Sequence, residues 1–488
     1  MELKIKLDSW LPDQPDYNNG LTVAENCLPI LKGYASTKSL TAFSGAGDSK
    51  LTGIFALEDS SGNAQIFAGN RTKLYKYNGT TNALDNVSIS GNYSAVGAND
   101  RWKFVQFGDK VIASAGTNQT IQVFDLGSST LFADIATGVN AEHICIARDF
   151  VFTGNNSDSI SRVRWSALGD SSSWTTSTTT QADFQEINDL GQITGLVGGE
   201  SVTIFCERGI VIGRYVGSPL IFQFDVVENN RGCNYAGSIT NVARTSFYYT
   251  DDGFYSFNER TGSTPIGHEK IDKFFQDDFN TTYKDNLYAS VDPKNKIVMF
   301  AYPSKSSSDG SNDKILVFNY ILNKWSLLNI ATDVLSQILT PATTLEGLDS
   351  ISGNNLDSMT TSLDSDIWKG GNILFVGSVD NKISTFTGST LSATLTTGEF
   401  SLGGSQMAML TKVRPYYETT GTATISNQIA SRNLTNDSFS FASAVSLNSD
   451  GFSPHRNSGR YNRVQINLGG DWKNIQEIDV ELQANGNR

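Results

Sequence analysis

A weak repeat is the feature of this 488-residue sequence that most restricts its fold. Each unit has a short β-rich run, a turn, and a second β-rich run that ends near an aromatic residue. The units are Leu51–Asn78, Arg101–Gly127, His143–Asp170, Ile193–Gly217, Gly237–Asn258, Tyr288–Asn329 and Ile373–Gly388. Their starts lie 50, 42, 50, 44 and 51 residues apart, and then 85 residues apart across an insertion. Four-stranded propeller blades recur at about 40–50 residues, so the spacing predicts a β-propeller.

Turn chemistry and composition also indicate an all-β fold. Gly-Asp, Asp-Asp-Gly and Asn-Lys corners separate the β-rich runs, and such residues tolerate the positive φ of hairpin turns. The 27 Phe, 17 Tyr and 7 Trp residues suit half-buried pleated surfaces. Few stretches place Ala, Leu, Glu and Lys at helical spacing. An array of two-sheet sandwiches is the competing fold, but Greek keys place their strands less evenly than this repeat does.

Two segments lie outside the repeat, one at each end of the chain. Residues 1–45 combine one strand pattern with a Pro- and Asn-rich loop, and residues 389–488 alternate as several strands. Because chain termini often lie close together, we expect both segments to form one β-sandwich-like platform domain. The propeller would then occupy residues 46–388.

An insertion at about 343–371 interrupts the propeller pattern. It contains three Leu-Asp pairs and ends near Trp368. Loops this long without periodicity are usually functional or disordered. We expect a strap that packs its Leu and Trp side chains on a neighbouring surface.

Reactive side chains are few and scattered along the chain. His143, His268 and His455 lie on unrelated segments, which does not support a Ser-His-Asp triad or a His-rich metal site. The four cysteines have no CxxC spacing, and no phosphate-binding loop occurs. The sequence therefore predicts no catalytic residue, no cofactor and no metal, and a protein that is not an enzyme.

A propeller glycosidase is the strongest enzymatic alternative, and it requires two carboxylates that flank a sugar. The segment Trp10-Leu-Pro-Asp-Gln-Pro-Asp16 resembles the aromatic and acidic opening of some five-bladed glycosidases. The Ser-x-Asp-x-Gly-x-Thr-Trp box of sialidases does not recur, and Asp170-Ser-Ser-Ser-Trp174 has a different spacing. A glycosidase and a host-glycan-binding tail protein both stay open as alternatives.

The net charge is −13, from 37 basic and 50 acidic residues. A protein that grips duplex DNA needs Lys and Arg to displace the counterions on phosphate. The acidity serves either solubility alone or an acidic wall along which DNA slides, since carboxylates repel phosphates within about 8–10 Å at physiological salt. No signal peptide and no run of about 18 apolar residues is present, so we expect cytosolic synthesis and no membrane span.

A series of short motifs follows in a specific order through the chain. In the middle these are Arg162–Trp174, Ile193–Glu200, Glu207–Ile210, Arg214–Gly217, Phe222–Asp225, Asn230–Cys233, Gly237–Ile239, Tyr249–Phe254, Pro265–Gly267 and Glu269–Phe275. At the ends they are Leu21–Pro29, Gly459–Val464, Gly470–Trp472 and Ile478–Val480. In this order the motifs resemble the tail nozzle (hub) proteins of podophages, also called packaged-DNA stabilisation proteins. The resemblance covers most of the chain.

The resemblance implies a structural protein of the virion that is assembled in the host cytoplasm. Copies would form a roughly six-fold ring, a homohexamer, below the portal and its adaptor. A needle or plug would close the lumen, tail fibres or spikes would dock nearby, and double-stranded DNA would pass without sequence-specific binding. The platform would meet the adaptor. Such a ring closes through head-to-tail interfaces.

Eight residues are candidate structural or interface positions. They are Trp165, Trp174, Arg208, Gly209, Arg231, Gly253, Trp325 and Trp368. Trp165, Trp174 and Trp325 are expected to anchor blade packing. Gly209 and Gly253 are expected at hairpin corners, where glycine supplies positive φ. Arg208 and Arg231 would bond neighbouring backbone or pair with acids across subunits.

Overall fold

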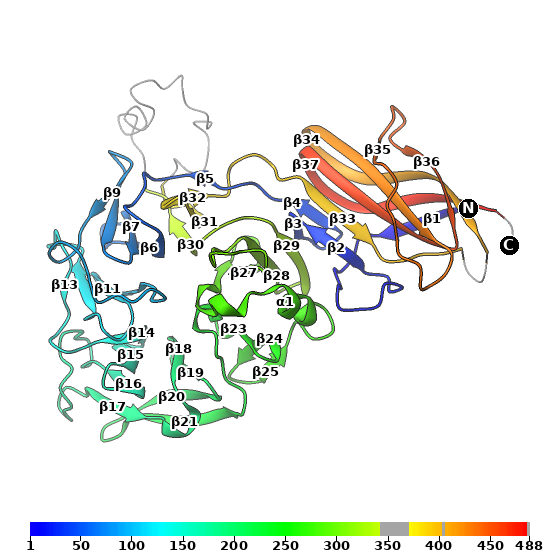
Figure 1. The fold of residues 1–488 in the computed structure, drawn as a ribbon. Coiled ribbons are helices and arrows are strands. Elements are labelled where there is room, and N and C mark those ends of the chain that lie inside the picture. Colours follow the sequence, from blue (N-terminus) through cyan, green and yellow to red (C-terminus); the bar gives the residue numbers. More distant parts are fainter. Residues whose placement is uncertain (342–369, 403–405, 486–488) are drawn as a thin grey trace.

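The computed structural model describes residues 1–341, 370–402 and 406–485. The regular secondary structure of these residues is almost entirely β, with one short α-helix, α1 (Asp272–Asp278). It forms a propeller and a second sheet domain built from both ends of the chain (Figure 1). The predicted fold class is therefore confirmed.

Six four-stranded sheets stand as separate blades around a common axis. The first blade consists of β6 (Leu51–Glu58), β7 (Ala64–Asn70), β8 (Leu74–Asn78) and β9 (Ala83–Asn86). The second consists of β10 (Lys103–Phe107), β11 (Lys110–Ser114), β12 (Gln122–Asp125) and β13 (Ala133–Asp134). The third consists of β14 (Ala141–Ala147), β15 (Phe150–Asn156), β16 (Ser159–Trp165) and β17 (Asp183–Glu186). The fourth consists of β18 (Ile193–Val197), β19 (Val202–Cys206), β20 (Gly209–Gly217) and β21 (Ile221–Asn229). The fifth consists of β22 (Thr240–Val242), β23 (Thr245–Thr250), β24 (Gly253–Asn258) and β25 (Gly262–Pro265). The last blade along the chain consists of β30 (Leu335–Leu339), β31 (Ile373–Val379), β32 (Lys382–Thr385) and the N-terminal β5 (Thr41–Ala42).

A further four-stranded meander completes the ring between the fifth and the last blade. It consists of β26 (Tyr288–Asp292), β27 (Ile297–Tyr302), β28 (Lys314–Asn319) and β29 (Lys324–Leu328), and it belongs to a larger 13-stranded sheet. Strand β5 closes the circle, because it pairs with β32 although more than 300 residues separate them in the sequence. Closure between distant segments removes one free sheet edge from the ring.

Aromatic side chains fill the spaces between blades. Phe67 of the first blade meets Phe124 and Phe132 of the second at ring-centroid distances of 5.3 and 5.8 Å. Trp165 of the third blade meets Phe222 of the fourth at 5.3 Å. Large rings that point alternately from each strand explain why the sequence is rich in aromatic residues but poor in helical patterns.

The platform domain joins the two ends of the chain in one sheet. Two long strands dominate it, β34 (Ala408–Arg432) and β37 (Tyr461–Ala484), which pair antiparallel along most of their length. β1 (Glu2–Lys6) and β4 (Tyr34–Ser36) also pair with β37. The remaining strands are β2 (Leu21–Glu25), β3 (Cys27–Pro29), β33 (Ala393–Thr397), β35 (Val445–Ser446) and β36 (Ser453–Gly459). The N-terminus and the end of β37 lie at the end of the platform that faces away from the propeller (Figure 1).

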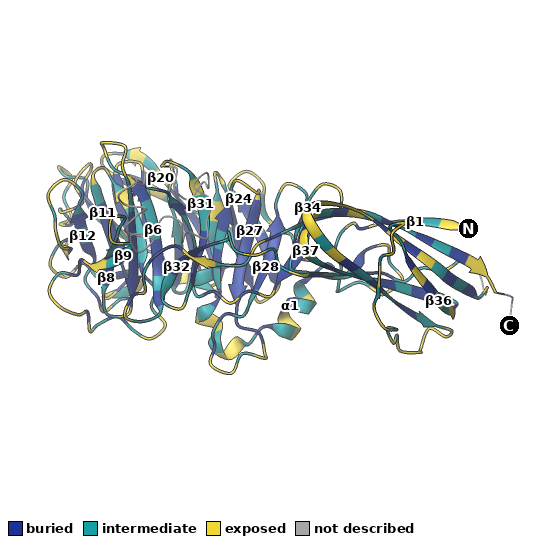
Figure 2. Cartoon of the chain, turned by 90° about the horizontal axis from the view of Figure 1, so that it is seen from above, coloured by how far each residue is buried: buried dark blue, intermediate teal, exposed yellow. Residues whose placement is uncertain are grey.

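One sheet and one apolar core connect the platform to the propeller. The strand order β26-β27-β28-β29-β2-β33-β37-β34 is continuous. Phe254 and Trp325 of the propeller belong to the same buried cluster as Val413 and Trp472 of the platform. The resulting molecule is long, with buried residues running through both parts (Figure 2).

The last repeat differs from the sequence analysis in where it begins. The unit was expected to start at Ile373, but its innermost strand is β30, which precedes the insertion. The insertion therefore separates the first two strands of one blade. The predicted strap at about 343–371 lies almost wholly outside the described residues, and so does Trp368.

Candidate functional site

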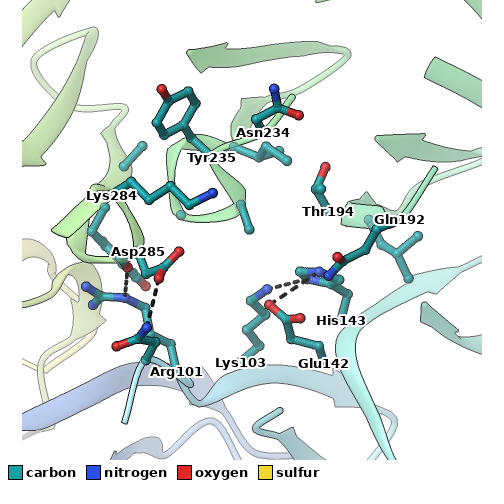
Figure 3. A pocket seen from close by; sticks show the side chains of 18 of the residues that line it. Arg101, Lys103, Glu142, His143, Gln192, Thr194, Asn234, Tyr235, Lys284 and Asp285 are labelled. Atoms are coloured by element: carbon teal, nitrogen blue, oxygen red, sulfur yellow. Dashed lines mark hydrogen bonds and ion pairs between the residues drawn. The ribbon is translucent and has the colours of Figure 1, made fainter. Parts of the chain in front are cut away.

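A polar pocket of about 900 Å³ lies at the axis of the propeller. Its walls come from the innermost strands β10, β14, β18, β22 and β26 and the loops that precede them, and from the turns that follow β19 and β23. Because every blade begins its innermost strand at the axis, residues about 40–50 positions apart in the sequence converge here. Figure 3 shows the side chains around the opening.

Three polar side chains form one wall of the pocket. Lys103 of β10 contacts Nδ1 of His143 on β14, and His143 Nε2 lies 3.6 Å from Oε1 of Glu142 (Figure 3). Burial, followed by the charge of Lys103, lowers the pKa of His143 well below its ordinary value. His143 is therefore neutral at pH 7, and its Nδ1 accepts a hydrogen bond from the Lys103 ammonium while Nε2 carries the ring proton.

Burial also lowers the pKa of Lys103, while the neighbouring Glu142 carboxylate opposes this shift. Glu142 is held by Asn155, whose side-chain amide donates to Oε2 at 2.5 Å. His143 is 1% exposed, and its Nε2 has no hydrogen-bond partner within the described part of the chain.

Arg101, two residues before Lys103, ties loops of neighbouring blades together at the edge of the pocket. Its guanidinium donates to the backbone carbonyls of Asp285 at 3.3 Å, Asn286 at 3.0 Å and Asp333 at 3.1 Å. The same group lies 5.0 Å from the centre of the Tyr288 ring. Arg101 thus uses its donors on backbone and fixes loops of different blades. Its role at the pocket is structural.

The remaining walls carry groups of both signs. Asp251 accepts hydrogen bonds from Asn234 at 2.8 Å and from the Tyr235 hydroxyl at 2.9 Å. Lys284 is exposed and makes no ion pair among the residues that the structure describes. Gln192 also lines the opening, and its backbone amide donates to the Glu207 carboxylate at 3.3 Å.

A second, smaller pocket of about 480 Å³ lies at turns of the third, fourth and fifth blades. Arg148 pairs with Glu200, and Arg214 pairs with Asp225 at 3.0 Å and with Glu259 at 3.6 Å. These side chains are largely exposed, so each pair contributes little to stability.

The candidate tryptophans lie in packed cores. Trp165 is 2% exposed, and its indole donates to the Gln181 carbonyl at 2.8 Å. Trp174 lies in the core between the second and third blades and donates to Ser171 at 2.7 Å. Trp325 is fully buried in the core shared by propeller and platform. None of the three lines the axial pocket.

The two candidate glycines have different conformations. Gly253 has a φ of +126°, and a Cβ there would approach the Asp272 carboxylate to 2.3 Å. Gly209 does not have the expected positive φ. A Cβ at Gly209 would instead lie 2.5 Å from the Glu228 carbonyl oxygen, so close approach of the neighbouring strand is the reason for glycine at this position.

The two candidate arginines make contacts within the chain. Arg208 lines the axial pocket and donates to the Asp189 carbonyl at 3.2 Å. Arg231 lies 4.8 Å from the centre of the Tyr255 ring, while its Nε has no hydrogen-bond partner among the described residues. The pocket residues Lys103, Glu142, Gln192 and Lys284 were not predicted, because no local motif connects them.

All four cysteines are free and buried, at Cys27, Cys145, Cys206 and Cys233. Burial raises the thiol pKa of Cys206 to about 12 and that of Cys233 to about 11. In the described part of the chain no cluster of His, Cys, Asp and Glu side chains could hold a metal ion. No helix there is long and apolar enough to cross a membrane.

No protein-family model matches the chain, and no curated protein matches it. Several solved structures are similar. An exo-β-1,3-galactanase from Phanerochaete chrysosporium with galactose is 8% identical, with a TM-score of 0.30, covering 91% of this chain and 100% of that one. Kluyveromyces lactis Hsv2 is 10% identical, with a TM-score of 0.32, and the match covers 67% of this chain and 97% of that one. A putative 6-phosphogluconolactonase from Bacteroides uniformis is 11% identical, with a TM-score of 0.33, and the match covers 61% of this chain and 97% of that one.

These similarities correct one prediction of the sequence analysis. The chain was predicted not to be an enzyme, but a glycosidase stands repeatedly among the structures it resembles. The prediction rested on the scarcity of histidines and motifs, and a glycosidase needs neither, since two carboxylates suffice. At 8–9% identity for this enzyme, and with TM-scores of 0.23–0.30, the similarity does not identify a reaction.

Proposed function

We propose that this chain is a structural subunit of a virion, and that copies of it form the ring-shaped nozzle of a short phage tail. The ring retains packaged double-stranded DNA and conducts it during ejection. The order of the nozzle-like motifs along most of the chain supports this function. The structural observation that carries the proposal is the apolar core that propeller and platform share, because a part that resists pressure must fix its two domains relative to each other.

The fourth blade offers a surface for contact between copies. Its outer strand β21 has nine residues, whereas the outer strands β9, β13, β17 and β25 have two to four. Val226 and Val227 on this strand are 52% and 39% exposed, and Leu220 beside it is 68% exposed. Natural proteins usually shorten or cover an unpaired edge strand, so a long apolar edge supports a protein partner.

The position proposed for this chain in the phage tail determines which partners it would contact. The ring is a homohexamer that contacts the tail adaptor through the platform, is closed by a needle or plug, and has fibres or spikes nearby. Permanent ring interfaces bury on the order of 2,000–5,000 Å². The net charge of −13 suits a conduit that DNA passes without sequence-specific binding.

Assembly of the purified chain tests this proposal. We expect light scattering and negative-stain micrographs to give closed rings of several 53.0 kDa subunits rather than single copies. Val227→Lys should reduce the ring fraction, because it places a charge on the apolar edge. Ile321→Lys is the matched control, since Ile321 is 67% exposed in a turn of a different blade. A chain that stays monomeric at high concentration, and that occupies no axial ring in the native particle, would refute the function.

A second candidate function is recognition or hydrolysis of a glycan by the propeller. The specific observation that favours it is the polar axial pocket, which has the volume of a typical ligand site. A release assay on oligosaccharides separates hydrolysis from binding alone. Loss of release in Glu142→Gln would assign any hydrolysis to this pocket.

A further inference from the structure

The axial pocket carries polar groups that the fold itself does not use. Lys103 contacts only His143 among the described residues and keeps further ammonium protons available. Oε1 of Glu142 accepts no hydrogen bond from any residue that the structure describes, because its contact with His143 Nε2 is 3.6 Å long. Lys284 points into the opening without an ion pair (Figure 3). These groups supply both donors and acceptors at one place.

The balance of charge restricts what can bind there. Five carboxylates line the pocket, at Asp100, Glu142, Glu207, Asp251 and Asp285. Four cationic side chains face them, at Arg101, Lys103, Arg208 and Lys284. A phosphate or another strong anion would be repelled by the acids, and an organic cation by the lysines. A ligand without net charge that offers many donors and acceptors fits both sets.

Hydroxyl groups have this property, since each donates one hydrogen bond and accepts two. A sugar places several hydroxyls on a compact ring, and the pocket volume of about 900 Å³ accommodates a short oligosaccharide. His143 lines the pocket but is only 1% exposed, which leaves almost none of its surface for a sugar to touch. It would act as a positioning residue that holds Lys103 and faces Glu142.

We infer that the axial pocket is a binding site for a neutral oligosaccharide, with Lys103 and Glu142 on one wall and Gln192 and Lys284 on the others. This inference rests on the second candidate function and does not depend on ring assembly. Each contact with a charged side chain is a charge-assisted hydrogen bond, which is stronger than a contact between neutral groups.

An array of neutral and acidic oligosaccharides of defined structure tests the inference, followed by calorimetric titration of the neutral oligosaccharide that gives the strongest signal. Inorganic tripolyphosphate is the anionic probe. We expect Glu142→Gln and Lys284→Ala each to weaken binding about tenfold. Lys284 is exposed, so Lys284→Ala should fold normally even if changes at the buried wall do not. Glu200→Gln and Lys110→Ala, which lie outside this pocket, should bind like the unchanged chain.

Three results would overturn the inference. The first is no binding of any neutral oligosaccharide at millimolar concentration, and the second is equal binding by the pocket variants and the unchanged chain. The third is tighter binding of acidic sugars or tripolyphosphate than of neutral sugars, which would make the pocket an anion site. Release of sugar products that is lost in Glu142→Gln would support the carbohydrate class and extend it to hydrolysis. Ring formation by the same variants, measured in parallel, reports separately on the nozzle.

Discussion

Asp272 at the start of α1 is expected to make the stability of this protein fall as the pH rises. Its carboxylate accepts a hydrogen bond from the Phe254 amide at 3.1 Å and packs closely against Gly253 and Gly267. Burial raises its pKa from 3.8 to about 6, and the Asp13 charge adds to the shift, while the Phe254 hydrogen bond and His268 oppose it. The folded state therefore binds this proton more tightly than the unfolded state does.

The sign and size of the effect follow from linkage. Because folding raises the pKa of Asp272, the protonated carboxyl stabilises the folded state fully below about pH 4. This stabilisation is lost as the pH rises through about 6. A shift from 3.8 to about 6 corresponds to about 3 kcal/mol at most, at 1.36 kcal/mol per pH unit. The side chain is partly exposed, so solvent screening reduces this to about 1–2 kcal/mol.

Asp272→Asn removes the charge and keeps an oxygen that can accept from Phe254. We expect it to raise the free energy of unfolding by about 1–2 kcal/mol at pH 8 and to change it little at pH 4. Urea unfolding followed by circular dichroism across this pH range measures the difference. Asp277→Asn is the control, since Asp277 is an exposed carboxylate on the same helix. A variant that is no more stable than the unchanged chain at pH 8, or equally stabilised at both pH values, would refute the reasoning.

Substitutions at three further positions and one labelling experiment test the packing. Trp325→Leu should lower the free energy of unfolding by about 3 kcal/mol in urea titrations, since the side chain is fully buried in the core shared by both domains. Asn26 has a φ of 56°, and its side-chain oxygen accepts a hydrogen bond from the Asn329 amide at 2.8 Å. Asn26→Gly should lower the free energy of unfolding by about 1 kcal/mol, because hydrogen bonds are lost. Asn26→Ala should lower it by about 1 kcal/mol more, because alanine is strained in a left-handed backbone conformation. Gly33→Ala should unfold the platform at lower urea, because its Cβ would lie 1.9 Å from the Ile475 carbonyl oxygen. Ellman's reagent should label no cysteine in the folded chain and all four in urea, since every thiol is buried.

The propeller was predictable from the sequence because each blade is a local meander. Four consecutive strands joined by short turns leave a period that survives large differences in loop length. The start of the last blade was not predictable, since the insertion separates Leu335–Leu339 from Ile373–Val379 by more than 30 residues. The closing strand Thr41–Ala42 is only two residues long, so it leaves no hydrophobic pattern of its own.

The axial pocket was not predictable from motifs, for a related reason. Many of its residues come from the starts of successive blades, so Lys103, Glu142 and Gln192 are each roughly one repeat apart. A search for local spacing does not find such a set. One signal was available, which is that polar residues stand at the beginning of successive repeats, where an innermost strand would be expected to be apolar. Aligning the repeats by their first strand would have brought these positions into one column.

The junction between propeller and platform determines how the two domains can move. The long strands β34 and β37 share an extended ladder, but β2 and β29 meet through a single parallel pair, Glu25 and Leu327. The Asn26 amide reinforces it by donating to the Leu327 carbonyl at 2.7 Å, and the Ser326 hydroxyl donates to Cys27 at 2.6 Å. With so few backbone hydrogen bonds, the shared apolar core supplies most of the resistance to bending, and apolar contact is less directional than a strand ladder. If the chain carries mechanical load in a ring, the junction should therefore yield before either domain unfolds.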